Sequence, residues 1–534
     1  MRLGGVAGNP FTLWSHLGCF YRPRGGADDG LSMAIPDARA LVAFNRFGLG
    51  PRPGDLAKMD DPREAILAEL SAPRVAAIDD PALLRTPVAL QAVYEDQDRK
   101  KQERERLGQE KLAQLGMPAP NVAASIGTPP AAPLPPALAM APSPSPPPMM
   151  AAQTMAAPSM APQPPPEQQI FRSEAAARLA QACAAPVGFA ERLVAFWSNH
   201  FCISVAKSNI GRACAGAFER EAIRPYVTGR FADMLRAVEQ HPGMLNFLDN
   251  AQSIGPDSKA GQNRNRGLNE NLAREILELH TMGVGSGYSQ NDVTQLARII
   301  TGWTIVGREG KLGEPGSFAF NANAHEPGPA ILLGRVYAQE GLAQGEAALA
   351  DIARQAAVAT HIARKFARHF VADDPDPALV GRLAKTFRDS EGDLGALAQA
   401  LVKDEAAWSA PPTKIRNPWE IVVAAQRAFN RPVGDAGPAL NAMNLLGMPL
   451  WQPGGPNGFS DDTTAWASPE GLKMRLELAA QFARQTKDAP NPVSLLDDIL
   501  GPGVSGETRD TVTRAESREQ AFALLIMSPE FQRR

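Results

Sequence analysis

Two histidines stand in helical patterns at positions where a large apolar side chain is expected. With residues placed about 100° apart around a helix, His200 in the segment 188–201 shares an arc with Phe196. His280 likewise lies on the apolar arc of the segment 270–281. Burial lowers the pKa of a histidine and favours the neutral ring, which acts as a general base or binds a metal. We therefore expect both rings to point into the protein interior.

This pair of histidines has two interpretations. Each ring can be a core histidine that is hydrogen-bonded to a carbonyl or a carboxylate, or both rings can converge on a cleft as general bases or metal ligands. In the second case, the candidate catalytic residues are His200, His280, Asn199, Asn269, Glu270, Arg274, Glu275 and Trp303. The candidate metal ligands are His200, His280 and His325. Periodicity within one helix gives no distance to another helix, so both interpretations stay open.

Basic residues gather in two further places. The polar loop 251–268 contains Lys259, Arg264 and Arg266, which are candidates for binding an anion if the loop is not simply a solvated connection. A later helical segment carries five basic residues on what we expect to be one face, either solvated or facing an acidic partner. These residues are His361, Arg364, Lys365, Arg368 and His369. The long loop 451–466 is expected to pack over the core or to line a groove.

Local signals place the helix that carries His280. Asn269 is a suitable N-cap, and Gly283 is a suitable stop. Glu270, Arg274 and Glu278 follow at intervals of four residues, which predicts a ladder of ion pairs on the polar face. The next helix begins with the pattern of a capping box, in which Ser289 and Asp292 exchange hydrogen bonds.

The chain is expected to be mainly α, with one large helical domain and one small β-hairpin over 316–336. His325 falls at the turn of that hairpin, either exposed or closing over the histidine cleft with Glu326. The expected organisation follows the changes in composition. Residues 1–36 form a disordered or wrongly assigned amino-terminal extension, 37–90 the first helices of the main domain, 91–116 a charged helix, 117–166 a disordered Pro/Ala/Met-rich insertion, and 167–534 the main helical domain.

Composition excludes several classes of protein. A formal charge of −3 argues against a general nucleic-acid binder, and the chain contains no run of 18 apolar residues that predicts a membrane span. The sequence contains no HExxH, GxSxG or GxxxxGK[ST] motif, so no zincin, α/β-hydrolase or P-loop site is expected. No motif identifies a cofactor. The chain has no clear signal peptide, which predicts a cytoplasmic location.

Four strings resemble a known bacterial family, domain of unknown function 1800 (DUF1800). They are RLVAFWSNHF at 192–201, the segment 223–250, LNENLAREILELHTMGVGSGYSQNDVTQLARIITGW at 268–303, and HEPGPAILLG at 325–334. The resemblance covers about 37–530, apart from the insertion. It implies no established activity and no catalytic residues. Members of the family often have export signals, which makes a periplasmic or envelope location the alternative, and often accompany a DUF1501 protein that resembles sulfatases.

Two classes of function follow from these patterns. The first is a partner-binding or assembly protein, which the missing motifs, the charged helix and the Pro-rich segment favour. The family association implied by the resemblance makes a DUF1501-family protein the candidate partner. The second is an enzyme with a site between the helices that end at His200 and His280, either hydrolytic or assisted by a metal or haem. We expect the first class.

Overall fold

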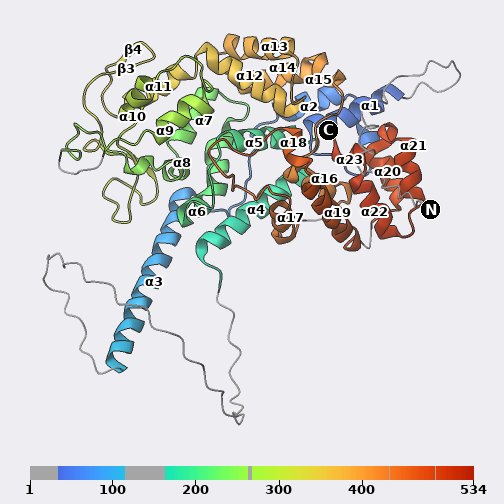
Figure 1. The fold of residues 1–534 in the computed structure, drawn as a ribbon, viewed down its shortest axis with the longest axis horizontal. Helices are drawn as coiled ribbons and strands as arrows, with labels where there is room; N and C mark the ends of the chain where they lie inside the picture. The colour runs from blue at the N-terminus through green and yellow to red at the C-terminus, as the bar shows by residue number, and fades with distance from the viewer. Residues whose placement is uncertain (1–33, 115–162, 263–266, 432, 487–488) are drawn as a thin grey trace, which may run out of the picture.

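The computed structural model describes residues 34–114, 163–262, 267–431, 433–486 and 489–534 (Figure 1). Most of the described chain is helical, and its strands are few and short. The predicted mainly α fold is therefore confirmed. Residues 1–33 of the expected extension 1–36, nearly all of the insertion 117–166, and the loop residues Arg264 and Arg266 lie outside the described residues, while residues 34–36 begin the first helix.

The helices follow one another through the whole described chain. They are α1 (Ala34–Val42), α2 (Pro62–Ser71), α3 (Thr86–Gln114), α4 (Pro166–Ala184), α5 (Phe189–His200), α6 (Asn209–Phe218), α7 (Phe231–Glu239), α8 (Pro242–Phe247), α9 (Asn271–Glu275), α10 (Gln290–Ile299), α11 (Leu342–Ile352), α12 (Ala356–Phe370), α13 (Pro377–Asp389), α14 (Leu394–Lys403), α15 (Glu405–Ser409), α16 (Pro418–Ala428), α17 (Gly437–Leu445), α18 (Thr463–Trp466), α19 (Pro469–Arg484), α20 (Pro492–Leu500), α21 (Gly506–Thr513), α22 (Arg518–Met527) and α23 (Pro529–Gln532).

Short turns of other helical types and four strands complete the elements. The π-helical turns are η2 (Ala43–Phe47), η4 (Glu219–Ile223) and η7 (Ile276–His280). The 3₁₀ turns are η3 (Leu56–Lys58), η5 (Arg224–Tyr226), η6 (Asn250–Gln252) and η8 (Gly501–Gly503). The strands are β1 (Trp303–Ile305), β2 (Phe318–Phe320), β3 (Ala330–Leu332) and β4 (Arg335–Tyr337).

The elements form two lobes with a helical centre (Figure 1). One lobe holds α7 to α14 with the strands, and the other holds α19 to α23, while α4, α5, α6 and α16 lie between them. The largest apolar core runs through α5, α10, α12 and α14, and two smaller cores lie under α16, α19 and α22 and between α4, α16 and α17. The helix α5 is therefore surrounded by other elements, and its whole inward face is buried.

The helix that carries His280 begins and ends near the predicted residues but changes type on the way. The side chain of Asn269 accepts a hydrogen bond from the N–H of Asn271, and Gly283 has a positive φ of 91°. Between them, the predicted continuous α-helix is interrupted, because α9 passes into the π-helical turn η7. A π turn inserts one extra residue and rotates the later residues of the helix about its axis. This turn sets the direction in which the His280 ring leaves the backbone.

The predicted capping box and ion-pair ladder are both confirmed. Ser289 and Asp292 exchange hydrogen bonds at the start of α10. Arg274 pairs with Glu270 at 3.3 Å and with Glu278 at 3.5 Å. These contacts hold the polar face of α9 and η7 toward solvent and so hold the opposite face toward the core.

The predicted hairpin over 316–336 is wrong in its pairing, because two separate antiparallel strand pairs are present. β2 pairs with β1, with Phe320 opposite Trp303, and β3 pairs with β4. The turn between β3 and β4 consists of Leu333 and Gly334, which have φ angles of 50° and 75°. Two successive residues with positive φ form the tight turn that matches strand twist. The reversal therefore occurs at Gly334 and not at the HEPG segment.

Candidate functional site

His200 and His280 meet in the interior. They are 2% and 0% exposed, and their ring centroids lie 6.4 Å apart. The Nε2 atom of His200 lies 3.0 Å from the carbonyl oxygen of His280. A carbonyl only accepts hydrogen bonds, so His200 carries its proton on Nε2. The prediction that both rings point inward is confirmed, and the structure also brings them together.

Glu239, the last residue of α7, holds the ring of His280. The Nδ1 atom of His280 lies 2.8 Å from Oε1 of Glu239, and both side chains are buried. The second nitrogens of the pair, Nδ1 of His200 and Nε2 of His280, are buried and have no hydrogen-bond partner among the described residues. Burial, helped by the charge of Lys365, lowers the pKa of His200 well below 6.5, so its ring is neutral at physiological pH.

The helix α12 adds three basic side chains to this pair. His361, Lys365 and His369 follow at intervals of four residues and so lie on one face. The ring of His361 lies 6.3 Å from the ring of His200, and His369 is 4% exposed. Burial and the charge of Lys365 lower the pKa of His361 to about 4, and burial also lowers the pKa of Lys365. Together these residues form a histidine centre, which we define as His200, His280, His361, Lys365 and His369.

The prediction that the five basic residues of this helix form one face is therefore wrong. Arg364 and Arg368 are exposed, but His361 and His369 pack against α5, and His369 also pairs with Asp461 of the segment 451–466. Lys365 is half-buried, and Asp461 opposes the lowering of its pKa by burial. The apolar side chains of Phe366 and Phe370 are buried beside these basic residues and pull that side of the helix into the core. A basic side chain at the edge of an apolar stripe is thus buried when the stripe packs into the core.

Asp461 orients the ring of His369. Its Oδ1 atom accepts a hydrogen bond of 2.7 Å from Nδ1 of His369, and its backbone oxygen accepts one of 2.7 Å from Lys414. Burial opposes ionisation of Asp461, but His369, Lys414 and Lys365 outweigh it and hold the pKa of this carboxyl below its usual range. Burial lowers the pKa of His369 to about 4, and Nε2 of this ring is buried without a partner in the described chain. An imidazole that is oriented by a carboxylate is the arrangement of a general base.

The segment 451–466 covers the end of α5, as expected. Asn199 makes two hydrogen bonds of 2.8 Å with the backbone of Phe459: Nδ2 donates to the carbonyl oxygen and Oδ1 accepts from the N–H. The N–H of Val205 donates to the carbonyl oxygen of Trp451 at 2.9 Å. Asn199 thus positions a backbone segment and does not point at the rings of the histidine centre.

The segment 451–466 also closes a small cavity against α5. The cavity has a volume of about 50 Å³, and Ser198, Asn199, Cys202, His369 and Asp461 are among its lining residues. Pockets for small-molecule ligands usually measure about 300 to 1,000 Å³. The cavity therefore has room for water but not for a substrate of ordinary size.

The possible nucleophiles in this cavity are not activated. The thiol of Cys202 is free, it donates to the carbonyl oxygens of Gly455 and Pro456, and burial raises its pKa to about 12. The hydroxyl of Ser198 donates to Glu219 at 2.8 Å. A protonated thiol is a weak nucleophile. Burial opposes ionisation of Glu219, but its ion pairs with Arg178 and Arg224 lower its pKa, so this carboxylate is a weak base for the hydroxyl of Ser198.

A group of buried, paired charges lies near His369. Glu420 lies 2.9 Å from Arg192 and 2.8 Å from Arg534, and all three residues are buried. Burial opposes ionisation of Glu420, but the two arginines lower its pKa to about 2. Removing one charged side chain from such a buried group strongly destabilises a protein. We therefore interpret these charges as structural.

The other predicted catalytic residues point to separate parts of the molecule. Asn269 donates to the carbonyl oxygens of Leu248 and Asp249. Glu270 and Arg274 pair on the solvated face of α9. Trp303 is fully buried against Phe318. Burial raises the pKa of Glu275 and outweighs the opposing influence of His280.

His325 does not join the histidine centre. The Nδ1 atom of His325 lies 3.0 Å from the carbonyl oxygen of Thr301, and its ring packs against Phe320 beside the strands. It is half-buried, not exposed at a turn as expected. Lys259 is exposed. Among the described residues, no group of three or more His, Cys, Asp or Glu has the arrangement to hold a metal ion.

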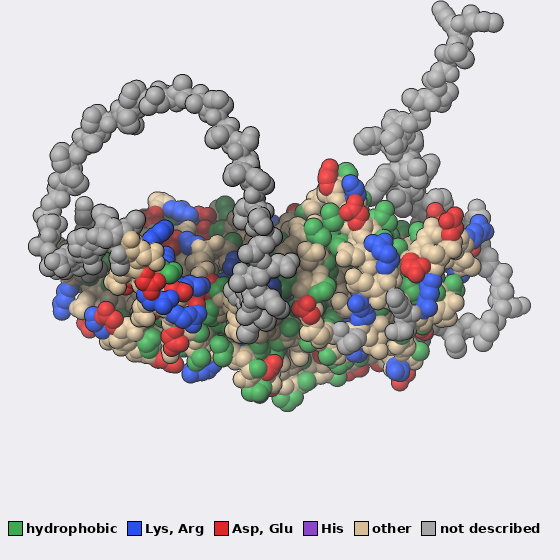
Figure 2. All heavy atoms as spheres, turned by 90° about the horizontal axis from the view of Figure 1, so that it is seen from below, with side chains coloured by type: hydrophobic (Ala, Val, Ile, Leu, Met, Phe, Trp, Pro, Cys, Tyr) green, Lys and Arg blue, Asp and Glu red, His purple; other side chains and the backbone are tan. Residues whose placement is uncertain are grey.

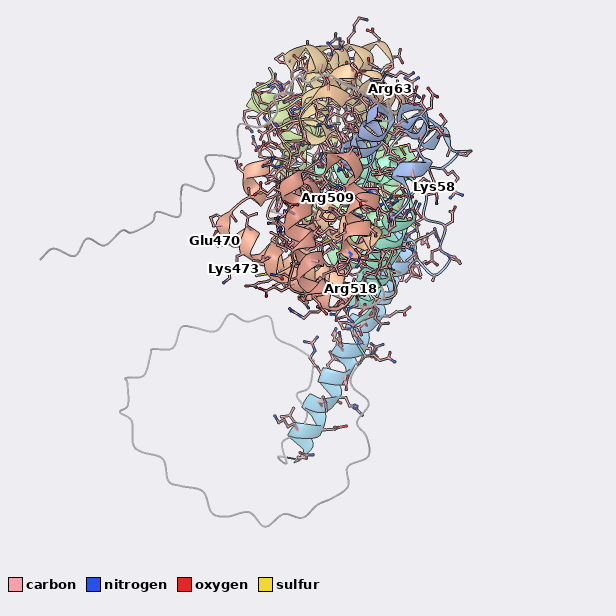
Figure 3. The ribbon with its side chains drawn as sticks, turned by 90° about the vertical axis from the view of Figure 1, so that its right-hand side faces the viewer. Lys58, Arg63, Glu470, Lys473, Arg509 and Arg518 are labelled. Carbon is pink, nitrogen blue, oxygen red and sulfur yellow. The ribbon has the colours of Figure 1, made fainter. Side chains whose placement is uncertain are left out.

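A second feature lies far from the histidine centre. The helix α3 is anchored at its first turns, where Thr86, Ala89, Leu90 and Val93 are at most 1% exposed. Its outer part leaves the body of the protein, and every residue from 99 to 111 is exposed (Figures 1 and 3). We call residues 99–111 the arm. Seen from below, basic and acidic side chains lie next to one another at several places on the visible face (Figure 2).

The comparisons with known proteins give one family. The family model described as "Protein of unknown function (DUF1800)" matches residues 42–533. No curated protein and no solved structure matches the chain significantly. In the part of the chain that the structure describes, no helix combines the length and the apolar composition that crossing a membrane requires.

Proposed function

The chain belongs to the DUF1800 family of proteins of unknown function, and we propose that it is a partner-binding or assembly protein that contacts its partner through the arm. One observation carries the proposal: a continuous helix whose base is in the core holds a run of exposed residues away from the body. A helix that is polar all round has no core to face, so its surface is available to another molecule.

The base of α3 fixes the direction of the arm. Gly316 lies so close to the base of α3 that a Cβ atom added to this glycine would be 2.9 Å from the Cβ of Leu90. The guanidinium of Arg308 lies 5.2 Å from the ring of Tyr94. Farther out, the helix is supported by ion pairs at intervals of four residues, such as Lys100 with Asp96 at 2.6 Å. The arm is therefore presented in one orientation, which lowers the entropy lost on binding.

The charges of the arm define the kind of partner. Its acidic residues are fewer than its basic ones: Glu103, Glu105 and Glu110 against Arg99, Lys100, Lys101, Arg104, Arg106 and Lys111. Leu107 is 51% exposed in the middle of this surface. Complementary charge speeds association and selects partners. We expect a partner with a net acidic surface around a small apolar patch, and the family association makes a DUF1501-family protein the first to test.

The histidine centre supports this proposal indirectly, because its properties are those of a polar core. Its rings bond to the carbonyl oxygen of His280, to Glu239 and to Asp461. The cavity beside it is about 50 Å³ in volume. Buried hydrogen bonds of this type stabilise a unique packing without any catalytic role.

The proposal is tested by affinity purification from the native cell with quantitative mass spectrometry. Three chains are compared: the wild type, an arm variant with Lys101→Glu, Arg104→Glu and Arg106→Glu, and a control variant with Lys385→Glu, Lys403→Glu and Lys473→Glu. All six positions are exposed, and Lys473 lies on the surface of the carboxyl-terminal lobe (Figure 3). The control therefore makes the same change of net charge away from the arm.

The expected result is a partner whose yield falls at least about tenfold with the arm variant and stays unchanged with the control. Equal partner yields from all three chains would remove the arm as the contact. A loss with both variants would assign the effect to net charge and not to the arm.

An enzyme with a site at the histidine centre is the second candidate function. The observation that favours it is the set of unpartnered nitrogens, Nδ1 of His200 and Nε2 of His280 and His369, which are buried in the described structure. A hydrolytic reaction, or one assisted by a metal or haem, would use these atoms. Its test is the metal content and visible spectrum of the purified protein. Stoichiometric metal or haem that is lost in His200→Ala and in His280→Ala would favour the enzyme over the assembly protein.

A further inference from the structure

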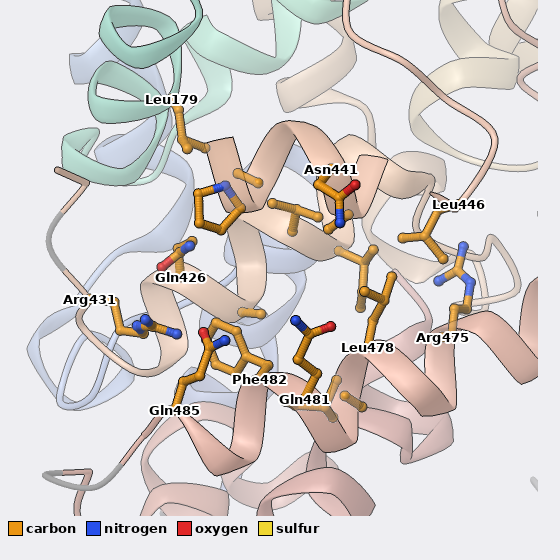
Figure 4. A pocket seen from close by; sticks show the side chains of 18 of the residues that line it. Leu179, Gln426, Arg431, Asn441, Leu446, Arg475, Leu478, Gln481, Phe482 and Gln485 are labelled. Atoms are coloured by element: carbon orange, nitrogen blue, oxygen red, sulfur yellow. The ribbon is translucent and has the colours of Figure 1, made fainter. Parts of the chain in front are cut away.

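A larger cavity lies between α16, α17 and α19, apart from both the histidine centre and the arm (Figure 4). Its volume is about 310 Å³, which is within the range of small-molecule pockets. Aliphatic and aromatic side chains form most of its wall, among them Leu179, Ile421, Leu446, Leu478 and Phe482. An apolar wall of this size favours a hydrocarbon group as the occupant.

A buried cation faces one end of this cavity. Arg475 is 4% exposed, and burial lowers its pKa to about 10, so it is still charged at neutral pH. Nη1 donates to Oε1 of Gln532, and Nη2 donates to the carbonyl oxygen of Arg416, each at 2.7 Å. Both acceptors are neutral. The charge of Glu420 raises the pKa of Arg475 and so opposes the effect of burial. Glu420 makes no ion pair with Arg475, and no other residue of the described chain does.

A buried charge is normally compensated by an opposite charge in contact with it, because desolvation of an isolated ion is unfavourable. Glu420 follows this rule by pairing with Arg192 and Arg534, but the buried Arg46 and Arg416 donate only to neutral acceptors in the described chain. Arg475 also contacts only neutral acceptors, and it differs from those two arginines in lining an apolar cavity. An anion in that cavity would supply the missing partner, and the low local dielectric would strengthen the contact.

A second arginine stands at the opposite side of the cavity (Figure 4). The guanidinium of Arg431 lies 4.8 Å from the ring centroid of Phe482. Its side chain is less buried than that of Arg475. Water screens a partly exposed charge, so an anion gains more at Arg475.

We propose that this cavity binds a small amphiphilic carboxylate. The carboxylate accepts a hydrogen bond from Nε–H of Arg475, and the hydrocarbon chain lies against Leu446, Leu478 and Phe482. The inference is independent of the partner-binding function, because neither the arm nor the histidine centre contributes to this cavity.

The first test compares two ligands of the same shape on the full-length protein. Octanoate and 1-octanol are titrated separately, and binding is followed by ligand-observed NMR. Octanoate is expected to bind with an affinity at least about tenfold higher than 1-octanol, because only the carboxylate compensates Arg475. Equal affinities, or no binding of octanoate up to its solubility limit, would overturn the proposal.

The second test fills the cavity. Ala442→Trp places a large side chain on α17 where it lines the cavity, and Asn444→Trp places the same side chain on the exposed side of α17. Octanoate binding is expected to be lost in the first variant and kept in the second. Binding that survives Ala442→Trp would show that octanoate sits elsewhere and would overturn the assignment. If Ala442→Trp does not fold, the ligand comparison on the wild type decides the question alone.

Discussion

The Nδ1 atom of His280 lies 2.8 Å from Oε1 of Glu239, and both side chains are buried. This contact joins the end of α7 to the π-helical turn η7. The carbonyl oxygen of the same histidine accepts the hydrogen bond from His200, so three elements meet at one residue. The pair is therefore a cross-link of the core as well as part of the histidine centre.

A double-mutant cycle on His280 and Glu239 tests this structural role. His280→Leu and Glu239→Leu each leave one buried polar group unpaired, so each is expected to lower the free energy of unfolding by about 2 to 4 kcal/mol. The double variant removes both groups and is expected to lose less than the sum, with a coupling energy of about 1 to 3 kcal/mol. Urea denaturation followed by circular dichroism measures these values. Strictly additive losses would show that the two side chains do not act as a pair.

The stability of the protein is expected to fall in mild acid. Burial and Lys365 lower the pKa of His361 to about 4 from 6.5, so the unfolded chain binds more protons than the folded chain between these pH values. The free energy of unfolding therefore rises with pH from about 4 to 6.5 and is then constant for this group. His200, whose pKa is lowered mainly by burial, adds to the same trend.

The variant His361→Gln isolates one part of that trend. This substitution removes the titrating ring, which is partly exposed. The decrease in the free energy of unfolding on acidification is therefore expected to become smaller by about 1 to 2 kcal/mol. Urea midpoints at pH 4.5 and at pH 7 in both chains give the comparison. An identical pH dependence in the variant would mean that this ring keeps an ordinary pKa in the folded protein.

The segment 451–466 is expected to loosen when Asn199 is shortened. Asn199→Ala removes two hydrogen bonds of 2.8 Å to the backbone of Phe459, at a cost of about 1 to 2 kcal/mol. Hydrogen exchange measured by mass spectrometry should then rise in peptides from 451–466, while peptides from α10 stay protected. Unchanged exchange in 451–466 would show that other contacts hold the segment.

Much of the fold could be predicted from single-helix patterns. The capping box of Ser289 and Asp292 and the inward direction of His200 and His280 depend on residues close in sequence, and all are confirmed. The same type of signal was available for Glu239. Phe231, Leu235 and Glu239 follow at intervals of four residues, which places an acidic residue on an apolar arc.

The remaining parts of the site depend on contacts between distant segments. Asp461 is 92 residues from His369, and no local pattern connects them. The strand pairs were mispredicted because Phe318 and Phe320 fit a return through β3 as well as a pairing with β1, and only tertiary packing selects between the two. The π-helical turn η7, which ends at His280, was likewise not predicted from the residue types of the helix.

The central claim is that the arm contacts a partner, and site-specific photo-crosslinking in the native cell tests it most directly. A photoreactive residue replaces Leu107 on the arm or, as a control, Leu476 on α19; these side chains are 51% and 52% exposed. The account predicts one dominant crosslinked protein from position 107, absent from position 476 and lost when Arg104 and Arg106 are changed to glutamate. Identical crosslinking patterns from the two positions, or none from 107, would contradict it.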